Sequence, residues 1–359
     1  MWCVLLGLLI VGAGPALSST VIGHEDNVQA AINAAARVGA DNHVILKAGV
    51  YNIDKIFVKS NVVLEGETCG GDVIFVQKGI VASGFFYVSG ADNVKIKNIR
   101  LISEWFFEND NCIPWESNNC GVGQMRGVFV RNSTNVELHG VEVNGFFKGI
   151  FVENSKYIII NACTSMYNFM VGVEIKYSDT VEIGSGSEEL KTTLKCVNAG
   201  TEYWNWLEKN SGLGGLYVNG AQNVRVEKLY AANHGWDGIA IRDTEHAIVT
   251  QCFVSNNHRH GINVFGYAGN YSSDVIVSHN ELHDNYNGVI LQYVSDVTIQ
   301  DNVIIGNTAK AIGVGTDSCN IDLVSNIIGQ GVYGVLIGRS IVDDYKIQNI
   351  RVVGNYIRC

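Results

Sequence analysis

Proline is almost missing from this chain, which carries it only at Pro15 and Pro114 among 359 residues. Because proline cannot donate a hydrogen bond to a β-ladder, its scarcity suits a chain made of hydrogen-bonded strands. Basic residues are also few: 25 Lys and Arg stand against 35 Asp and Glu, for a formal net charge of −10. This balance argues against nucleic acid as a partner, and an anionic ligand would need a local cluster of cations.

Several other features are missing. Beyond the N-terminus, no segment is long and apolar enough to cross a membrane. The sequence has no glycine-rich phosphate loop, zinc-ligand spacing or glycine-rich calcium nonapeptide, so no cofactor is predicted, and calcium is left open in case acidic residues cluster on one face. There is no Pro/Ser-rich linker or shift in composition either. We therefore expect residues 19–359 to form one domain, which we take to be monomeric.

Residues 1–18 have the pattern of a secretory signal peptide. The apolar run from Val4 to Val11 is followed by small residues, with Ala16 and Ser18 placed for cleavage. A membrane anchor is the alternative, but the run is too short to span a bilayer. Glycosylation sequences at Asn132 and Asn270 fit a secreted, extracellular protein.

Removal of Cys3 with this segment leaves eight cysteines, an even number in an oxidising compartment. Cys112 and Cys120 share one polar loop and are predicted to form a disulfide. Cys163 and Cys252 each lie nine residues before a repeated glycine. That shared position predicts that both point inward, as buried free thiols or an internal stack.

Glycine is abundant, at 40 of 359 residues against an average of about 7%, and it recurs periodically. Gly215, Gly238 and Gly261 lie 23 residues apart, and each opens a short strand with β-branched residues. Related positions extend the repeat in both directions: Gly127, Gly149, Gly172, Gly288, Ala311 and Gly334. Units of about 22–23 residues that bury their apolar side chains against their neighbours are typical of a β-helix. The sequence therefore predicts an all-β, right-handed parallel β-helix.

The N-terminal part of the mature chain is expected to close one end of this β-helix. Asp26 is placed to cap a helix over residues 27–36, with Val28, Ile32 and Ala35 on one face. Such a helix covers a coil whose edge would otherwise be exposed. The first strands are predicted at residues 44–51 and 56–64.

Two intervals of 43 residues, Gly84 to Gly127 and Gly172 to Gly215, interrupt the repeat. Each is interpreted as one coil with a long loop, at residues 103–126 and 185–214. Both loops carry aromatic residues, which stack on sugars when they lie beside a binding site. Trp204 is assigned to substrate binding on this basis, and packing within the loop is the alternative.

The strand after each glycine is predicted to display a binding face. Its first and third positions should point inward, and its second and fourth outward. From coil to coil the outward pairs are Phe129/Arg131, Phe151/Glu153, Glu174/Lys176, Tyr217/Asn219, Ala240/Arg242, Asn263/Phe265 and Ile290/Gln292, followed by the bare Gly313/Gly315 and Leu336/Gly338. Ionic and aromatic groups fill the middle coils and small ones the C-terminal end, which favours a binding face over a merely solvated one.

A motif in these middle coils has a counterpart in a known family. The segment His258-Arg259-His260-Gly261-Ile262-Asn263-Val264 resembles the Asp-Arg-His-Gly-Phe-Asn-Val segment of the mannuronan C5-epimerases, β-helical enzymes that act on alginate. Gly235-Trp236-Asp237-Gly238 resembles their Gly-Leu-Asp-Gly turn. The resemblance implies roles for Asp237, Arg259 and His260. The family's Tyr-Gly-x-Asp-Pro-His-Glu, one coil earlier, has no counterpart in Gly214–Asn219, so its catalytic Asp and His are missing here.

Enzymes that epimerise or cleave polyuronates remove the C5 proton, which requires the adjacent carboxylate to be neutralised. Lys176, Arg242 and Arg259 are candidates for this task. His260 or Tyr217 would take the proton, and Tyr217 could instead donate one. The predicted catalytic set is His260, Tyr217, Arg242 and Asp237, which lies at the leading edge of the strand. The substrate-binding candidates on this face are Lys176, Arg259, Glu174, Asn219, Asn263, Glu153 and Arg131.

Epimerisation and β-elimination need the same residue types, so the sequence leaves both open. A glycoside hydrolase is the next alternative, since it needs two carboxyl groups about 5–9.5 Å apart. Glu153 and Glu174, interpreted as equivalent positions on neighbouring coils, are the candidates for that pair. A carbohydrate-binding β-helix without catalysis is the third alternative.

Overall fold

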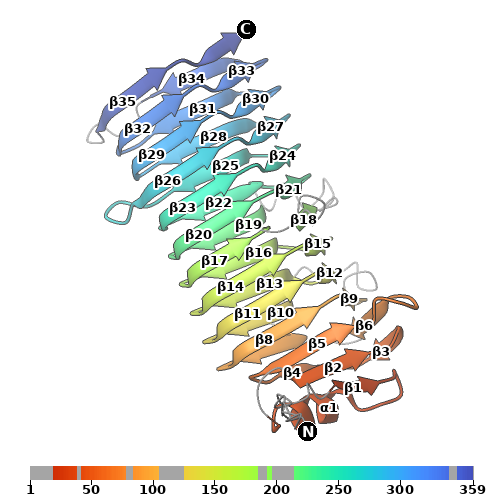
Figure 1. Cartoon of the computed structure of the whole chain (residues 1–359). Helices are drawn as coiled ribbons and strands as arrows, with labels where there is room; N and C mark the ends of the chain where they lie inside the picture. The colour runs from red at the N-terminus through yellow and green to blue at the C-terminus, as the bar shows by residue number, and fades with distance from the viewer. Residues whose placement is uncertain are drawn as a thin grey trace, which may run out of the picture.

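The structure is a computed structural model and describes residues 19–38, 42–77, 84–104, 125–184, 192–195, 214–338 and 346–358. Within these ranges the chain winds into an elongated stack of coils whose strands form three parallel sheets (Figure 1). The predicted parallel β-helix is thus confirmed. The predicted signal peptide, the Cys112–Cys120 disulfide and Trp204 lie outside the described residues.

The three sheets are named A, B and C and run the length of the stack. The thirteen described strands of sheet A are, in order, β1 (Ser19–Ile22), β2 (Asn42–Leu46), β5 (Val62–Gly66), β8 (Asp92–Lys97), β11 (Thr134–His139), β14 (Lys156–Asn161), β17 (Asp179–Ile183), β20 (Gln222–Glu227), β23 (Glu245–Thr250), β26 (Ser272–Ser278), β29 (Val294–Gln300), β32 (Ser318–Val324) and β35 (Ile347–Val353).

The described strands of sheet B are β3 (Gly49–Asn52), β6 (Val73–Gln77), β9 (Arg100–Ser103), β12 (Glu142–Asn144), β15 (Thr164–Met166), β18 (Thr192–Lys195), β21 (Leu229–Ala232), β24 (Phe253–Ser255), β27 (Glu281–His283), β30 (Val303–Ile305), β33 (Ile327–Gly329) and β36 (Tyr356–Arg358). Those of sheet C are β4 (Ile56–Val58), β7 (Phe86–Ser89), β10 (Arg126–Arg131), β13 (Lys148–Glu153), β16 (Val171–Lys176), β19 (Gly214–Asn219), β22 (Ile239–Arg242), β25 (His260–Phe265), β28 (Asn287–Gln292), β31 (Lys310–Gly315) and β34 (Tyr333–Ile337).

A short helix, α1 (Val28–Ala35), lies at the N-terminal end of the stack (Figure 1). It buries Val28, Ile32 and Ala35, as predicted. The predicted cap was wrong by one residue: Asn27 has extended backbone angles, and its side chain accepts a hydrogen bond from the Ala30 N–H at 2.9 Å. The carboxylate of Asp26 accepts instead from the Gly23 N–H, at 2.6 Å.

Sharp corners separate strands that the sequence analysis had merged. Residues 44–51 span β2 and β3, which belong to different sheets, and residues 56–64 likewise span β4 and β5. The corner before β5 includes Asn61, whose φ of 59° is the left-handed conformation that asparagine tolerates well. The polar residues Lys59, Ser60 and Asn61 mark this corner in the sequence, and the prediction of one continuous strand over 56–64 had overlooked them.

The two long intervals each hold one coil, as predicted: β7, β8 and β9 in the first and β16, β17 and β18 in the second. The predicted extent of the second loop, 185–214, was wrong, because it contains β18. That strand pairs with β15 and β21 and so continues sheet B. The remaining parts of both loops, residues 105–124, 185–191 and 196–213, lie outside the described residues.

The repeated glycines face the interior of the coil. A Cβ added at Gly215 would lie 2.5 Å from His234 Nε2, and one at Gly238 would lie 2.5 Å from Val254 Cγ1. No larger residue fits such a space without displacing its neighbours. Because the glycine and the residue after it both point inward, the residue before the glycine projects from the outer face of sheet C. Strict alternation of inward and outward side chains predicts the opposite orientation for the residue before the glycine.

The interior combines apolar side chains with buried polar stacks. Cys163 and Cys252 are buried free thiols, as predicted, and burial raises the pKa of each to about 12. A ladder of asparagines runs through Asn280, Asn302 and Asn326. Within it, the Asn302 amide group donates to the Val277 carbonyl oxygen and to Asn326 Oδ1, both at 2.9 Å. These bonds satisfy groups that water cannot reach.

Replacing Asn302 with alanine is expected to lower the free energy of unfolding by at least about 3 kcal/mol, since it leaves several buried donors and acceptors unpaired. Urea denaturation measures the change. The control is Gln222→Ala: that side chain lies in sheet A and donates one hydrogen bond, to Glu245 Oε2 at 3.3 Å, at an exposed site. A loss for Asn302→Ala no larger than that of the control would contradict this role for the ladder.

Candidate functional site on the outer face of sheet C

Three columns of side chains run along the outer face of sheet C. Column 1 holds the residue before each repeated glycine (or before Ala311, which takes its place in β31), column 2 the second residue after it and column 3 the fourth. The strand register aligns Tyr217 with Glu174 and Ala240 in column 2. It aligns Asn219 with Lys176 and Arg242 in column 3. The predicted outward pairs are therefore neighbours on one face, and His260 joins them from column 1.

Arg242 and Tyr217 are directly bonded across adjacent coils. Arg242 Nη1 donates a hydrogen bond to the Tyr217 hydroxyl oxygen at 2.9 Å, and Arg242 Nε donates to Asp243 Oδ2 at 3.1 Å. The guanidinium carbon also lies 4.2 Å from the centre of the Tyr267 ring. These contacts hold the cation in one place beside a phenol that is only 5% exposed.

Asp237 and His260 form a second cluster beside this pair. Asp237 Oδ1 accepts from the His260 backbone N–H at 3.2 Å, and Asp237 Oδ2 accepts from Asn263 Nδ2 at 2.9 Å. The amide nitrogen Nδ2 of Asn287 lies 3.0 Å from His260 Nδ1. The amide oxygens of Asn263 and Asn287 are buried and make no hydrogen bond within the described residues.

Burial changes the protonation of this cluster. Desolvation raises the pKa of Asp237 to about 6, although the positive charge of Arg259 acts in the opposite direction. Desolvation, followed by the charges of Arg259 and Lys310, lowers the pKa of His260 to about 3. The imidazole is therefore neutral at ordinary pH. Burial also raises the pKa of Tyr217, against the opposing effect of Arg242, so its hydroxyl stays protonated.

Arg259 belongs to the same cluster through its charge rather than a direct bond. Its guanidinium carbon lies 4.6 Å from the centre of the Trp236 ring, a cation–π contact. Lys176 also lies over an aromatic ring, with its Nζ 5.2 Å from the centre of Tyr177. Both predicted cations are thus placed against aromatic side chains.

Column 1 also contains cations that the sequence analysis had not read. Lys148 forms a buried ion pair with Glu174, and burial lowers the pKa of this lysine. The guanidinium carbon of Arg126 lies 4.6 Å from the Phe129 ring centre and 4.8 Å from that of Phe151. The sequence does carry a signal for these cations. A charged residue comes directly before several of the repeated glycines, as in Arg126-Gly127 and Lys148-Gly149.

The predicted equivalence of Glu153 and Glu174 was wrong. Glu153 aligns with Lys176 in column 3, whereas Glu174 aligns with Phe151 in column 2, because the two residues lie at different distances from their glycines. Glu153 is also paired with Arg131, whose Nε lies 3.4 Å from its carboxylate. The two acids therefore do not form the matched pair that the hydrolase alternative had used.

The described residues contain no group of three or more His, Cys, Asp or Glu side chains that could hold a metal ion. They also contain no helix that is both long enough and apolar enough to cross a membrane.

Comparisons with known proteins identify the architecture. The family described as "Right handed beta helix region" matches residues 198–358. The A-module of the mannuronan C-5 epimerase AlgE4 from Azotobacter vinelandii is similar in structure, with 16% identity, coverage of 92% of each chain and a TM-score of 0.66. The predicted right-handed β-helix, and its likeness in fold to the mannuronan epimerases, are thereby confirmed.

Two other solved structures share this fold. The surface protein and adhesin PfbA of Streptococcus pneumoniae is 14% identical over 94% of this chain and 99% of its own, with a TM-score of 0.60. The catalytic domain of a GH87 α-1,3-glucanase, in complex with tetrasaccharides, is 13% identical over 96% of this chain and 70% of its own, with a TM-score of 0.58. No curated protein matches the sequence. At such identities the similarity shows the fold alone, so the argument for function rests on the site.

Proposed function

We propose that this protein is a secreted enzyme that acts on an acidic, uronate-containing polysaccharide by abstracting the proton at C5, with epimerisation or β-elimination as the outcome. The observation that carries the proposal is the hydrogen bond from Arg242 to Tyr217, on the same face as the Asp237–His260 cluster. It places a fixed cation beside a protonated phenol, with a neutral imidazole on the same face. Secretion is inferred from the pattern of residues 1–18.

Arg242 is the group best placed to neutralise the substrate carboxylate. Its Nε and Nη1 are used by Asp243 and Tyr217, whereas Nη2 has no hydrogen-bond partner among the described residues. A cation that is already oriented stabilises the charge that develops on the carboxylate without a further cost of reorganisation. Lys176 and Arg259 add positive charge to the same face.

His260 and Tyr217 are assigned as proton acceptor and proton donor. For His260 to accept the C5 proton at Nε2, the ring proton must be on Nδ1. The Nδ1–H group must then donate a hydrogen bond to an amide oxygen. Asn287 Oδ1, which lacks any other partner among the described residues, can turn to that position. A bound uronate would raise the basicity of His260, because a nearby negative charge favours the imidazolium form.

The two alternatives have less support from the geometry. A hydrolase needs a pair of carboxyl groups across the scissile bond, and the pair expected from the sequence is split between two columns and bound to Lys148 and Arg131. A purely carbohydrate-binding protein would not need a buried imidazole kept neutral on the same face as a protonated phenol. The shared fold fits an epimerase, a glucanase and an adhesin equally well.

The proposal is tested by incubating the purified protein with alginate, pectate and glucuronan, with and without calcium. Unsaturated chain ends, followed by ultraviolet absorbance, would identify a lyase. A changed ratio of uronate residues at constant chain length, followed by the anomeric proton signals, would identify an epimerase. Reducing ends without unsaturation would indicate a hydrolase, and binding without any product would indicate a carbohydrate-binding protein. Either of the last two results would overturn the proposal.

A further inference from the structure

The outer face of sheet C is hollowed beyond the candidate site, toward its C-terminal end. The hollow has a volume of about 210 Å³, and the residues that line it include Ile290, Gln292, Lys310, Gly313, Gly315 and Thr316. It lies over β28 and β31, two of the coils that follow His260 in the stack. The sequence analysis had described this end of the face only as bare.

Two glycines create the hollow. Gly313 and Gly315 occupy columns 2 and 3, where the preceding coil carries Ile290 and Gln292. A Cβ at Gly313 would lie 2.7 Å from Ile290 Cδ1 and 3.2 Å from Lys310 Cδ, so both side chains lie over this buried glycine. At Gly315 the nearest atoms to an added Cβ are 3.9 Å away, and the space is open. The open part of the floor is therefore the backbone at Gly315, with the Ile290 side chain and the Lys310 stem beside it.

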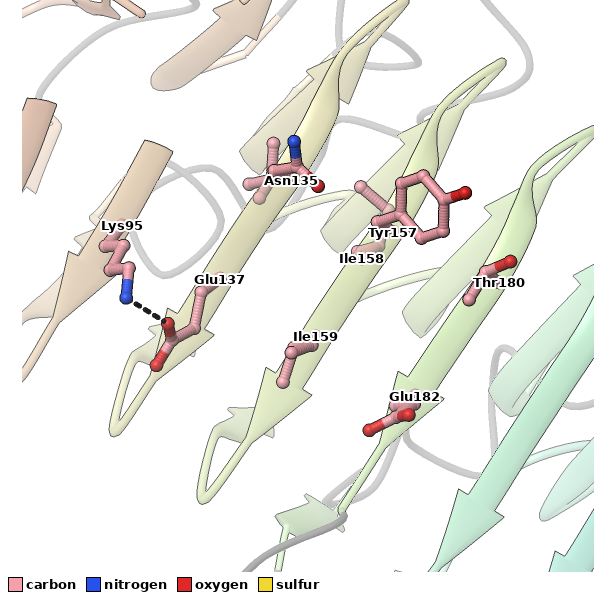
Figure 2. A pocket seen from close by; sticks show the side chains of 9 residues that line it. Lys95, Asn135, Glu137, Tyr157, Ile158, Ile159, Thr180 and Glu182 are labelled. Carbon is pink, nitrogen blue, oxygen red and sulfur yellow. Dashed lines mark ion pairs between the residues drawn. The ribbon is translucent and has the colours of Figure 1, made fainter. Parts of the chain in front are cut away.

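The charge of this hollow distinguishes it from one of similar size on sheet A, of about 230 Å³, shown in Figure 2. There, the dashed line marks the ion pair of Lys95 with Glu137, at 3.1 Å, and Glu182 adds a second acid. In the sheet C hollow none of the lining residues is acidic, and Lys310 forms no ion pair with a described residue. The charge of the lining residues therefore disfavours an anion in the sheet A hollow and favours one in the sheet C hollow.

We propose that the hollow over Gly313 and Gly315 is a sugar-binding subsite that takes one uronate unit of the bound polysaccharide, with Lys310 bound to its carboxylate. The sugar ring would lie against the backbone at Gly315, where the space is open, with one edge against the Ile290 side chain. Lys310 and His260 are both in column 1 and two coils apart, roughly 10 Å. This inference rests on the proposed function, because it assumes a uronate chain bound along sheet C.

The position of Lys310 also couples the subsite to the candidate base. Its positive charge contributes to the lowered pKa of His260. A carboxylate bound to Lys310 would offset that charge and make His260 a stronger base. Substrates long enough to reach the subsite should therefore bind more tightly and also react faster than shorter ones.

Two variants test the subsite. Lys310→Met removes the cation and keeps most of the stem, and Gly315→Leu fills the open space. The controls are Lys95→Met, in the hollow on sheet A, and Gly329→Leu in β33, where an added Cβ would meet its nearest atom at 3.6 Å. Circular dichroism and thermal unfolding check that all four variants keep the fold.

Calorimetry then compares dimers with hexamers of mannuronate, galacturonate and glucuronate, and rates are followed by the product assay. In the wild type the preferred hexamer should bind more tightly than its dimer, which is too short to reach the subsite from His260. Lys310→Met and Gly315→Leu should weaken hexamer binding about tenfold or more, because a charge-assisted contact is lost or blocked, and should leave the affinity for the dimer unchanged. The two controls should behave as the wild type.

The possible failures are distinct. If the wild type converts the uronate oligomers but the two variants bind the hexamer normally, the subsite is wrong and the proposed function stands. If the wild type neither binds nor converts any uronate oligomer, both are overturned. If cellohexaose, which lacks carboxylates, binds as tightly as the glucuronate hexamer and is equally sensitive to Lys310→Met, the assignment of Lys310 to a carboxylate is wrong.

Discussion

Replacing Arg242 with alanine is expected to lower kcat on the preferred polyuronate by about 10²–10³-fold or more while the fold remains intact. The variant loses the oriented cation that would stabilise negative charge as the C5 proton leaves, and such preorganised groups have effects of this size. It also loses the hydrogen bond to the Tyr217 hydroxyl. Initial rates of product formation, followed by ultraviolet absorbance or proton resonance, measure the change.

The conservative variant Arg242→Lys should fall between the wild type and Arg242→Ala, because lysine keeps the charge but not the planar fork of donors. Arg225→Ala is the matched control: Arg225 lies on sheet A and pairs with Glu227 at 2.8 Å, away from the candidate site. His260→Gln should also abolish turnover, since glutamine cannot accept the proton. Normal rates in both Arg242→Ala and His260→Gln would remove this site from catalysis.

The second large effect is a change in how stability depends on pH. The pKa of Asp237 is about 6 in the folded protein and 3.8 in its unfolded reference. Between about pH 4 and pH 6 the folded state therefore holds more protons than the unfolded state, and this residue makes stability fall as pH rises. His260 has the opposite effect: its pKa is lowered from 6.5 to about 3, so its contribution increases with pH across the same range. In the wild type the two effects largely cancel.

Asp237→Asn removes the contribution of Asp237 to the pH dependence of stability and leaves that of His260. The free energy of unfolding of this variant should match the wild type near pH 4 and exceed it by up to about 3 kcal/mol at pH 7, since a shift of about two units is worth roughly that amount. The fold should survive, because the free Oδ1 of Asn263 can accept a hydrogen bond from the new amide. Urea denaturation between pH 4 and pH 7 measures the difference.

His260→Gln is the complementary variant and should show the reverse slope, with stability falling between pH 4 and pH 6. An Asp237→Asn variant whose stability follows the wild-type curve at every pH would show that Asp237 is not a buried acid of raised pKa. The other carboxyl groups titrate equally in all three proteins, so they add the same pH dependence to each. The difference in slope between each variant and the wild type therefore reports on Asp237 or His260 alone.

Much of the site could be read from spacing alone. Because the coils stack in register, residues 23 apart in sequence become neighbours, and this placed Tyr217 beside Ala240 and Asn219 beside Arg242 correctly. The same method failed for Glu153 and Glu174, which lie at different offsets from their glycines. It identified Asp237 and His260 in column 1 but missed Arg126 and Lys148, because the inward glycine breaks the alternation from which the outward positions were predicted.

What the sequence determined by itself is the repeat: its period, its inward apolar positions, its N-terminal helix and the set of polar residues available on one face. These features follow from local patterns, because every coil buries apolar side chains at equivalent positions against the coils on either side. Only the tertiary structure decided which of these side chains meet. The bond from Arg242 to Tyr217, the link between Asp237 and Asn263, and the hollow beside Lys310 all join different coils. Their protonation depends in turn on burial, which arises only when the coils are stacked.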